Sequence, residues 1–106
     1  MKKVIIESPY AGDVVRNESY AKECMKDCLN RNEAPFVSHL LYTQVLDDTV
    51  IEQRHLGIEA GLEWGKMADK TVVYTDYGIS KGMELGIARA QKEDREIEYR
   101  KLYATT

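Results

Sequence analysis

The sequence predicts a small doubly wound α/β domain, in which a mostly parallel sheet of four to five strands is flanked by helices. Short β-branched runs alternate with stretches of helical periodicity, in the order β-α-β-α-β-α-β. Loops that contain glycine, a hydroxyl and an acid follow two of the strands, as at the ligand-binding edge of parallel sheets. With 106 residues, the chain is expected to form a single domain over residues 1–106.

The first third of the chain predicts a strand, a helix and a second strand. Residues 3–7 are typical of a strand buried on both faces, and turn-forming residues follow in segment 8–13. A helix is expected to begin near Val15 or Asn17 and to end at Asn30. Its apolar face is formed by Ala21, Cys24, Met25, Cys28 and Leu29. Residues 34–37 begin a second short strand.

The middle of the chain predicts a connecting segment and a long helix. Residues 38–46 either extend the strand or form a loop, and Asp47, Asp48 and Thr49 are typical of a loop and helix cap. The helix is expected over residues 50–67, with one apolar stripe formed by Ile51, His55, Ile58 and Leu62. Three glycines recur along it every four residues, at Gly57, Gly61 and Gly65. They indicate either close packing of the helix against the sheet or contact with a ligand.

The last third of the chain predicts a strand at residues 71–75, a loop at 76–82 and a helix at 83–91. Residues 97–102 form a last strand or the start of a C-terminal tail. Right-handed crossovers between parallel strands leave few topologies. The expected sheet is therefore Rossmann-like or flavodoxin-like.

Composition and charge exclude several classes of protein. The net charge of −3 lacks the basic excess of a protein that binds polymeric DNA or RNA. The longest apolar run, Val4 to Ile6, is far shorter than the roughly 20 residues of a membrane span, and too short for the core of a signal peptide. Cys24 and Cys28 are interpreted as buried thiols in a reducing environment, which predicts a cytoplasmic protein.

Two loops and one histidine carry the candidate binding residues. The loop after the first strand supplies Ser8, Pro9, Tyr10, Gly12 and Asp13, and the loop after the third strand supplies Asp76, Gly78, Ser80 and Gly82. Exposed backbone N–H groups at such loops favour an anion such as phosphate or carboxylate. His39 follows the second strand, where it either faces the pocket or is a hydrogen-bonded structural histidine. We expect the two loops to face one cleft.

Glu84 lies in the first turn of the last helix, where the helix dipole favours an ionised carboxylate. Such a carboxylate can attack a sugar anomeric carbon, although acids are common in first turns for the dipole alone. The string from Gly82 to Ala88, GMELGIA, resembles the G-x-x-E-x-G-x-A signature of the nucleoside deoxyribosyltransferases and their relatives, the nucleotide N-glycosidases. Residues 67–74 resemble another stretch of the same family, A-D-x-V-V, which leads into the strand that precedes this helix.

The resemblance implies a fold, an activity and roles for these residues. Glu84 would be the nucleophile, Asp76 or Glu63 would assist the departing base, and Tyr10 would orient the sugar or the nucleophile. Phosphate or sugar would be held by Ser8, Gly12, Ser80 and Gly82. The implied partner is a small-molecule nucleoside or nucleotide, and neither a metal nor a redox cofactor is needed.

A second interpretation is a catalytically silent module that senses or sequesters a nucleotide or an NAD-derived signal. The chain also resembles a group of short phage and bacterial proteins, through S-P-Y-x-G-D near its start and the His39-Leu40-Leu41 segment. Base release from deoxynucleotides distinguishes the enzyme from the binding module.

A homo-oligomer, a twofold dimer or a dimer of dimers, is expected from a second apolar stripe on the predicted helix. It is formed by Leu56, Ala60, Trp64 and Met67. Related transferases complete their sites with a neighbouring chain, which implies the same here. The alternative is that residues 38–48 fold back and cover this stripe within one chain.

Overall fold

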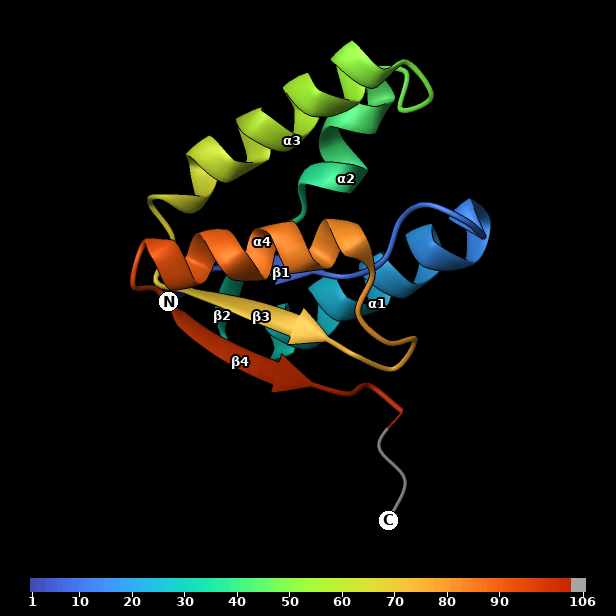
Figure 1. Ribbon diagram of the computed structural model, residues 1–106. Helices are drawn as coiled ribbons and strands as arrows, with labels where there is room; N and C mark the ends of the chain where they lie inside the picture. The colour runs from blue at the N-terminus through green and yellow to red at the C-terminus, as the bar shows by residue number, and fades with distance from the viewer. Residues whose placement is uncertain (104–106) are drawn as a thin grey trace.

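The computed structural model describes residues 1–103, which form an α/β fold around one four-stranded parallel sheet (Figure 1). The strand order is β2-β1-β3-β4, and every neighbouring pair is parallel. The strands are β1 (Lys2–Glu7), β2 (Glu33–Phe36), β3 (Lys70–Tyr74) and β4 (Glu96–Arg100). The predicted doubly wound parallel sheet is confirmed, with four strands.

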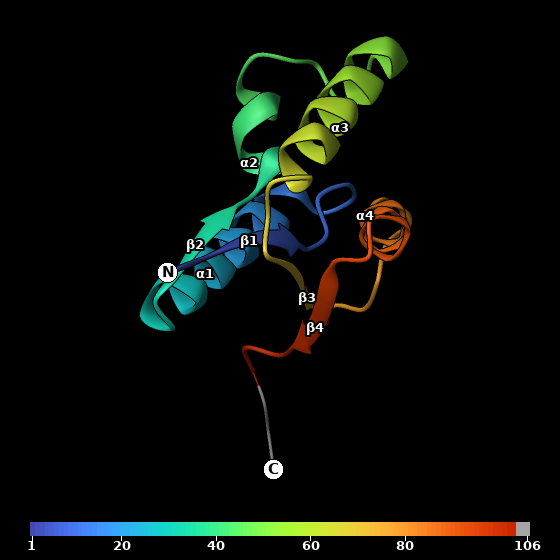
Figure 2. The same cartoon turned by 90° about the vertical axis from the view of Figure 1, so that its left-hand side faces the viewer.

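The helices lie on both sides of this sheet (Figure 2). They are α1 (Val14–Asn30), the short α2 (Ser38–Leu41) with the 3-10 turn η1 (Tyr42–Gln44), α3 (Ile51–Gly65) and α4 (Lys81–Lys92). One face is covered by α1, whereas α4 lies across the other face, next to the paired α2 and α3. No helix in residues 1–103 is both long and apolar enough to cross a membrane.

The hydrophobic core lies between α1 and the sheet. From the strands it takes Val4, Ile6, Val72 and Tyr74, and from α1 it takes Tyr20, Ala21, Cys24 and Cys28. The helix begins where the Asp13 side chain accepts a hydrogen bond from the Arg16 amide, which satisfies one free N–H of the first turn. The buried cysteines are therefore confirmed, as is the helical face at Ala21 and Met25, whereas Leu29 is exposed and does not belong to that face.

The connection before α3 differs from the prediction. Asp47 does not cap the helix; its carboxylate accepts hydrogen bonds from the Thr49 amide and hydroxyl, and it closes a local turn. The N-cap of α3 is Val50, which has no capping side chain. Short acidic segments serve both roles, so the sequence alone does not separate a cap from a turn.

The glycine face of α3 packs mainly against the α2–η1 segment. Gly57 lies against Leu46 and Tyr42, and a methyl group at Gly61 would overlap the Ser38 side chain. Only Gly65 lies near the sheet, beside Ile5. The prediction of close helix–sheet packing along all three glycines is therefore wrong.

The predicted apolar stripe of α3 is only partly covered. Ile51 and His55 are exposed, whereas Ile58 and Leu62 line a cavity. The outer stripe also stays exposed at Leu56, Trp64 and Met67. Residues 38–48 pack on the glycine face instead, so the alternative in which they cover the outer stripe is wrong.

Candidate functional site

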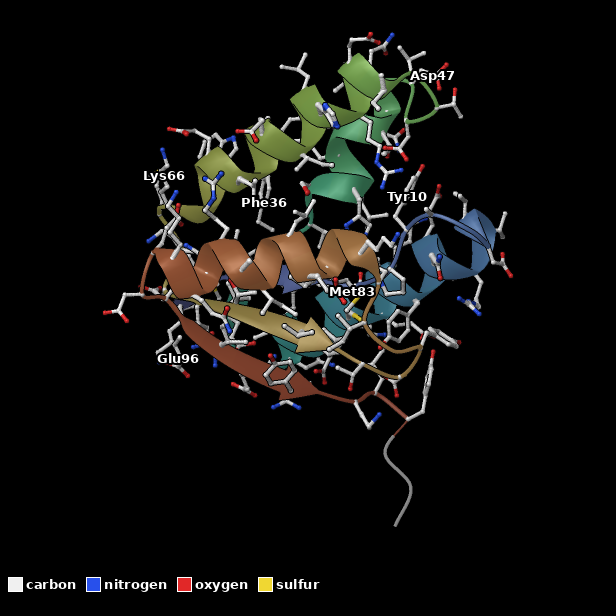
Figure 3. All side chains as sticks on the ribbon, viewed as in Figure 1. Tyr10, Phe36, Asp47, Lys66, Met83 and Glu96 are labelled. Carbon is white, nitrogen blue, oxygen red and sulfur yellow. The ribbon has the colours of Figure 1, made fainter. Side chains whose placement is uncertain are left out.

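A cavity of about 330 Å³ opens at the carboxyl ends of β1 and β2, between α3 and α4. Its walls come from the β1–α1 loop, the start of α2, one side of α3 and the first turns of α4. Figure 3 labels three residues that line it: Tyr10 of the β1–α1 loop, Phe36 of β2 and Met83 of α4. Ligands of doubly wound sheets bind at this edge.

Glu7, the last residue of β1, places a carboxyl group in the cavity. The side chain lies against α4 at Gly86, where a methyl group would overlap its carboxyl. Burial raises the pKa of Glu7 to about 8, and the Arg95 charge lowers it only in part. Within residues 1–103 no side chain hydrogen-bonds to it. At neutral pH Glu7 is therefore mostly a neutral acid that can donate a proton to a ligand.

Ser8 and His39 form a polar pair in the wall of the cavity. Ser8 Oγ and His39 Nε2 are 3.0 Å apart. Burial lowers the pKa of His39 to about 4, so the imidazole is neutral at pH 7. The Tyr10 ring lies 5.8 Å from the His39 ring, between centroids. The pair offers a ligand hydroxyl both hydrogen-bond donors and acceptors next to an aromatic ring.

Three cations also line the cavity: Arg54, Lys81 and Arg95. The Arg95 guanidinium donates to Thr71 Oγ1, the Gly65 carbonyl and Glu93, so it links β3, the end of α3 and the α4–β4 turn. Its side chain is only 6% exposed. Arg95 therefore supports the floor of the cavity, whereas Arg54 and Lys81 are the cations available to a ligand.

The structure brings five of the predicted site residues together around this cavity: Ser8, Tyr10, His39, Ser80 and Gly82. The loops after β1 and β3 thus contribute to one cavity, because β1 and β3 are adjacent and parallel. Sequence reasoning does not single out Glu7, although a carboxylate that ends an otherwise apolar strand is a usable signal. For Arg54 the sequence offers either a bidentate phosphate contact or pairing with Glu52 or Glu59 on a solvated helix face. In the structure Arg54 lines the cavity, and its ion-pair partner is Asp48.

Three of the predicted acids lie outside the cavity. Glu84 is exposed on α4, two positions from both Gly82 and Gly86, which line the cavity. At about 100° per residue this spacing turns Glu84 to the opposite side of the helix, so the expectation that its carboxylate lies in the pocket is wrong. Glu63 is also exposed and pairs with Lys66 at 2.8 Å.

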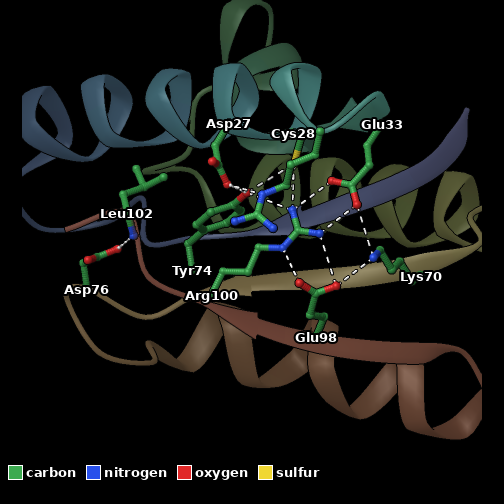
Figure 4. Close-up of polar contacts among 10 residues, drawn as sticks. Asp27, Cys28, Glu33, Lys70, Tyr74, Asp76, Glu98, Arg100 and Leu102 are labelled. Atoms are coloured by element: carbon green, nitrogen blue, oxygen red, sulfur yellow. Dashed lines mark hydrogen bonds and ion pairs between the residues drawn. The ribbon is translucent and has the colours of Figure 1, made fainter. Parts of the chain in front are cut away.

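Asp76 lies on the α1 side of the sheet. It accepts a hydrogen bond of 2.5 Å from the Tyr20 hydroxyl and another from the Tyr103 amide. A third comes from the Leu102 amide (Figure 4). Both carboxylate oxygens are used to fix the segment after β4. Asp76 therefore joins α1 to the segment after β4 and does not line the cavity.

The other predicted binding residues shape the loops. Gly12 and Gly78 have φ of +97° and +83°, a backbone region that glycine adopts readily. Asp13 caps α1, and Pro9 is buried. None of these four residues lines the cavity.

The sequence matches the family described as a domain of unknown function (DUF7768) over residues 2–100, and the chain belongs to this family. The fold is also similar to a solved 2-deoxyribosyltransferase from Bacillus psychrosaccharolyticus, with a TM-score of 0.68. That similarity covers 98% of this chain and 75% of the other at 16% sequence identity. The resemblance expected from the sequence is therefore confirmed at the level of the fold. No curated protein matches the chain.

Proposed function

We propose that the chain binds a nucleoside or nucleotide in the cavity and acts on its N-glycosidic bond, by transfer of the sugar or by hydrolysis. The observation that carries the proposal is Glu7, whose carboxyl lies in the cavity with a pKa of about 8. The fold shared with a 2-deoxyribosyltransferase supports the same substrate class.

Cleavage of the bond needs a proton for the departing base. As the C–N bond breaks, its electron pair goes to the base nitrogen, and neutral Glu7 can donate the proton that this nitrogen takes up. The sugar becomes oxocarbenium-like, a water molecule or a second base adds to its anomeric carbon, and the proton that the added group releases returns to the Glu7 carboxylate. The Ser8–His39 pair, near the Tyr10 ring, is placed to hold a sugar hydroxyl.

Glu84 stays a prediction as nucleophile. The Gly82–Ala88 string supports the role, whereas the exposed position of its side chain requires the first turn of α4 to rearrange before it can reach the sugar. This position favours a second candidate function, nucleotide binding without turnover. Asp48 is the other carboxylate that lines the cavity among the described residues, and it lies 3.8 Å from Arg54.

The test combines base release with binding. The protein is incubated with a panel of 2′-deoxynucleosides and their 5′-monophosphates, with and without a second free base, and products are separated by chromatography. Glu7→Gln should lower base release about 100-fold or more, since loss of a general acid typically costs 10²–10⁴-fold. Glu59→Gln, at an exposed position of α3 outside the cavity, is the control and should leave the rate unchanged.

Each result assigns a function. A large loss in Glu84→Gln with retained binding supports the nucleophile role, and full activity in that variant removes it. Binding by the unchanged protein without base release supports the binding module. Absence of both binding and base release would reject the proposal and its alternative together.

A further inference from the structure

The mouth of the cavity is marked by two side chains, Arg54 of α3 and Asp48 of the loop before it. Both also line a smaller hollow of about 60 Å³ beneath α2 and η1, and an open groove along the β1–α1 loop. Arg54 therefore borders the cavity and two adjoining hollows, and its side chain is partly open to solvent. A ligand in this part of the cavity can contact the guanidinium.

The charges that line the cavity are unbalanced. Arg54 has Asp48 as its ion-pair partner at 3.8 Å, and the two side chains are 42% and 32% exposed. Such a long, solvated pair is weak and changes partners at little cost. Lys81, which lines the same cavity, forms no ion pair with any side chain in residues 1–103. Apart from Arg95, which is paired with Glu93, the cavity is thus lined by two cations, Arg54 and Lys81, and by the carboxylate of Asp48, while the Glu7 carboxyl is largely neutral at pH 7.

The deeper wall has a different character. Ile5, Phe36 and Met83 give it apolar surface, and the Tyr10 ring adds an aromatic edge. A ligand that fits the whole space has a flat, weakly polar part for the interior and a dianionic group for the mouth. A nucleoside 5′-monophosphate has both parts, whereas a nucleoside lacks the anion.

We propose that Arg54, together with Lys81, binds the phosphate of a nucleoside 5′-monophosphate, so that the cavity selects nucleotides over nucleosides. This inference rests on the proposed function and names the phosphate state of its substrate. A guanidinium can donate two parallel hydrogen bonds to a phosphate, and Asp48 is then displaced from Arg54 by the stronger anion.

Calorimetric titration at pH 7 tests the inference by binding alone. The probes are 2′-deoxynucleoside 5′-monophosphates, the matching 2′-deoxynucleosides, 2-deoxyribose 5-phosphate and inorganic phosphate. We expect the nucleotide to bind at least 10-fold more tightly than its nucleoside. Arg54→Gln should weaken nucleotide binding roughly 10- to 100-fold, as expected for hydrogen bonds to a charged group, and should leave nucleoside binding unchanged. Arg54→Lys should restore part of the loss.

Two further variants sharpen the test. Asp48→Asn removes the competing anion and should tighten nucleotide binding several-fold, which a purely structural role of Arg54 does not predict. Arg31→Gln removes an equal charge from a partly exposed ion pair at the C-terminal end of α1, outside the cavity, and should change neither affinity. Thermal melts verify that each variant is folded.

The outcomes separate this inference from the proposed function. Equal binding of nucleotide and nucleoside, or an unchanged nucleotide affinity in Arg54→Gln, overturns the phosphate site and leaves the glycosidic proposal standing. Tight binding of inorganic phosphate that free nucleotide cannot displace also overturns it. If neither nucleotide nor nucleoside binds, both proposals fail.

Discussion

The two faces of the sheet use neighbouring residues of the same strands for opposite purposes. In β1, Val4 and Ile6 are buried in the core under α1, whereas Ile5 and Glu7 line the cavity on the other side. The α1 side is filled and its buried polar groups are paired. The α4 side leaves a cavity and, at Glu7, a carboxyl to which no side chain of residues 1–103 hydrogen-bonds. The period of two along a strand thus gives one sheet a stable side and a side available for ligands.

Glu33 and Glu7 show the same contrast for a single residue type. Glu33 accepts two hydrogen bonds from Arg100, at 2.8 and 2.7 Å, and lies 3.2 Å from Lys70 (Figure 4). Hydrogen bonds from Arg100, helped by Lys70, lower the pKa of Glu33 to about 2. Burial without such partners raises the pKa of Glu7 to about 8. Stronger desolvation and the lack of hydrogen-bond donors keep Glu7 protonated, whereas donors from Arg100 and Lys70 keep Glu33 charged.

Removal of Arg100 should produce the largest effect on stability. Arg100→Leu leaves Glu33 and Glu98 with Lys70 as their remaining cation, and breaking a buried ion pair typically costs about 3–5 kcal/mol. Lys66→Leu breaks an exposed pair with Glu63 and should cost at most about 1 kcal/mol. Denaturant unfolding of both variants measures the difference. Equal losses would show that the α1 side does not depend on this network.

The pH dependence should be opposite for the two faces. Glu7 binds a proton more tightly when folded, so between its ordinary pKa of 4.5 and about 8 each rise in pH lowers the free energy of unfolding. The slope is at most about 1.4 kcal/mol per pH unit, and cavity water reduces the total to about 3 kcal/mol or less. Glu7→Gln should lose this slope. Unfolding curves at pH 5 to 9 check it, and parallel curves for the two proteins would contradict a raised pKa.

On the α1 side, low pH should lower the free energy of unfolding. The pKa values of Glu33 and Glu98 are both lowered to about 2, first by hydrogen bonds from Arg100. Their contribution to stability is therefore present above pH 4.5 and is lost as the pH falls towards 2. The same unfolding series extended to low pH should show this loss unchanged in Glu7→Gln, because the two groups lie on opposite faces.

A matched pair of glycines in α4 gives a smaller effect. A methyl group at Gly86 overlaps the Glu7 carboxyl, so Gly86→Ala should cost about 2 kcal/mol through overpacking and should displace Glu7. At Gly82 a methyl group meets only Ser80 Oγ, at 4.0 Å. Gly82→Ala should therefore gain up to about 1 kcal/mol from helix propensity. Thermal unfolding compares the two, and a neutral Gly86→Ala would mean that Glu7 moves freely.

The sequence predicted the fold better than the site. Strand and helix positions follow from local periodicity, and the predicted strands lie within one or two residues of the observed ends. The site depends on which side of a helix faces the sheet. Glycines every four residues along α3 indicate either packing against the sheet or contact with a ligand, but Gly57 and Gly61 lie against Leu46 and Ser38, and only Gly65 lies near the sheet. The α2–η1 segment has no periodic pattern that would predict this packing surface.

The prediction that Glu84 lies in the pocket is wrong for the same reason: the sequence does not show which side of a helix faces the sheet. The Gly82–Ala88 string identifies the helix and its family resemblance, but the rotation of α4 about its axis is set by long-range packing of Met83, Gly86 and Ala90, which are buried. Glu7 was overlooked because a glutamate at a strand end resembles a simple terminator. Only the approach of Gly86, 79 positions along the chain, encloses its carboxyl.

The smallest effect on folding is expected on the outer side of α3, where Trp64 is 54% exposed beside Leu56 and Met67. This apolar stripe belongs to the cavity side of the molecule, and no segment among residues 1–103 covers it. If a second copy covers it, as expected for a twofold homo-oligomer, Trp64→Lys should change the unfolding free energy of the monomer by less than about 0.5 kcal/mol while abolishing the oligomer. Light scattering at micromolar concentration should then give a mass above 12.1 kDa for the unchanged chain and near 12.1 kDa for the variant.

Glu59→Lys, at an exposed position of the same helix outside the stripe, is the control for the added charge. A mass near 12.1 kDa for the unchanged chain would show that the stripe stays open to solvent and that the cavity is complete within one chain.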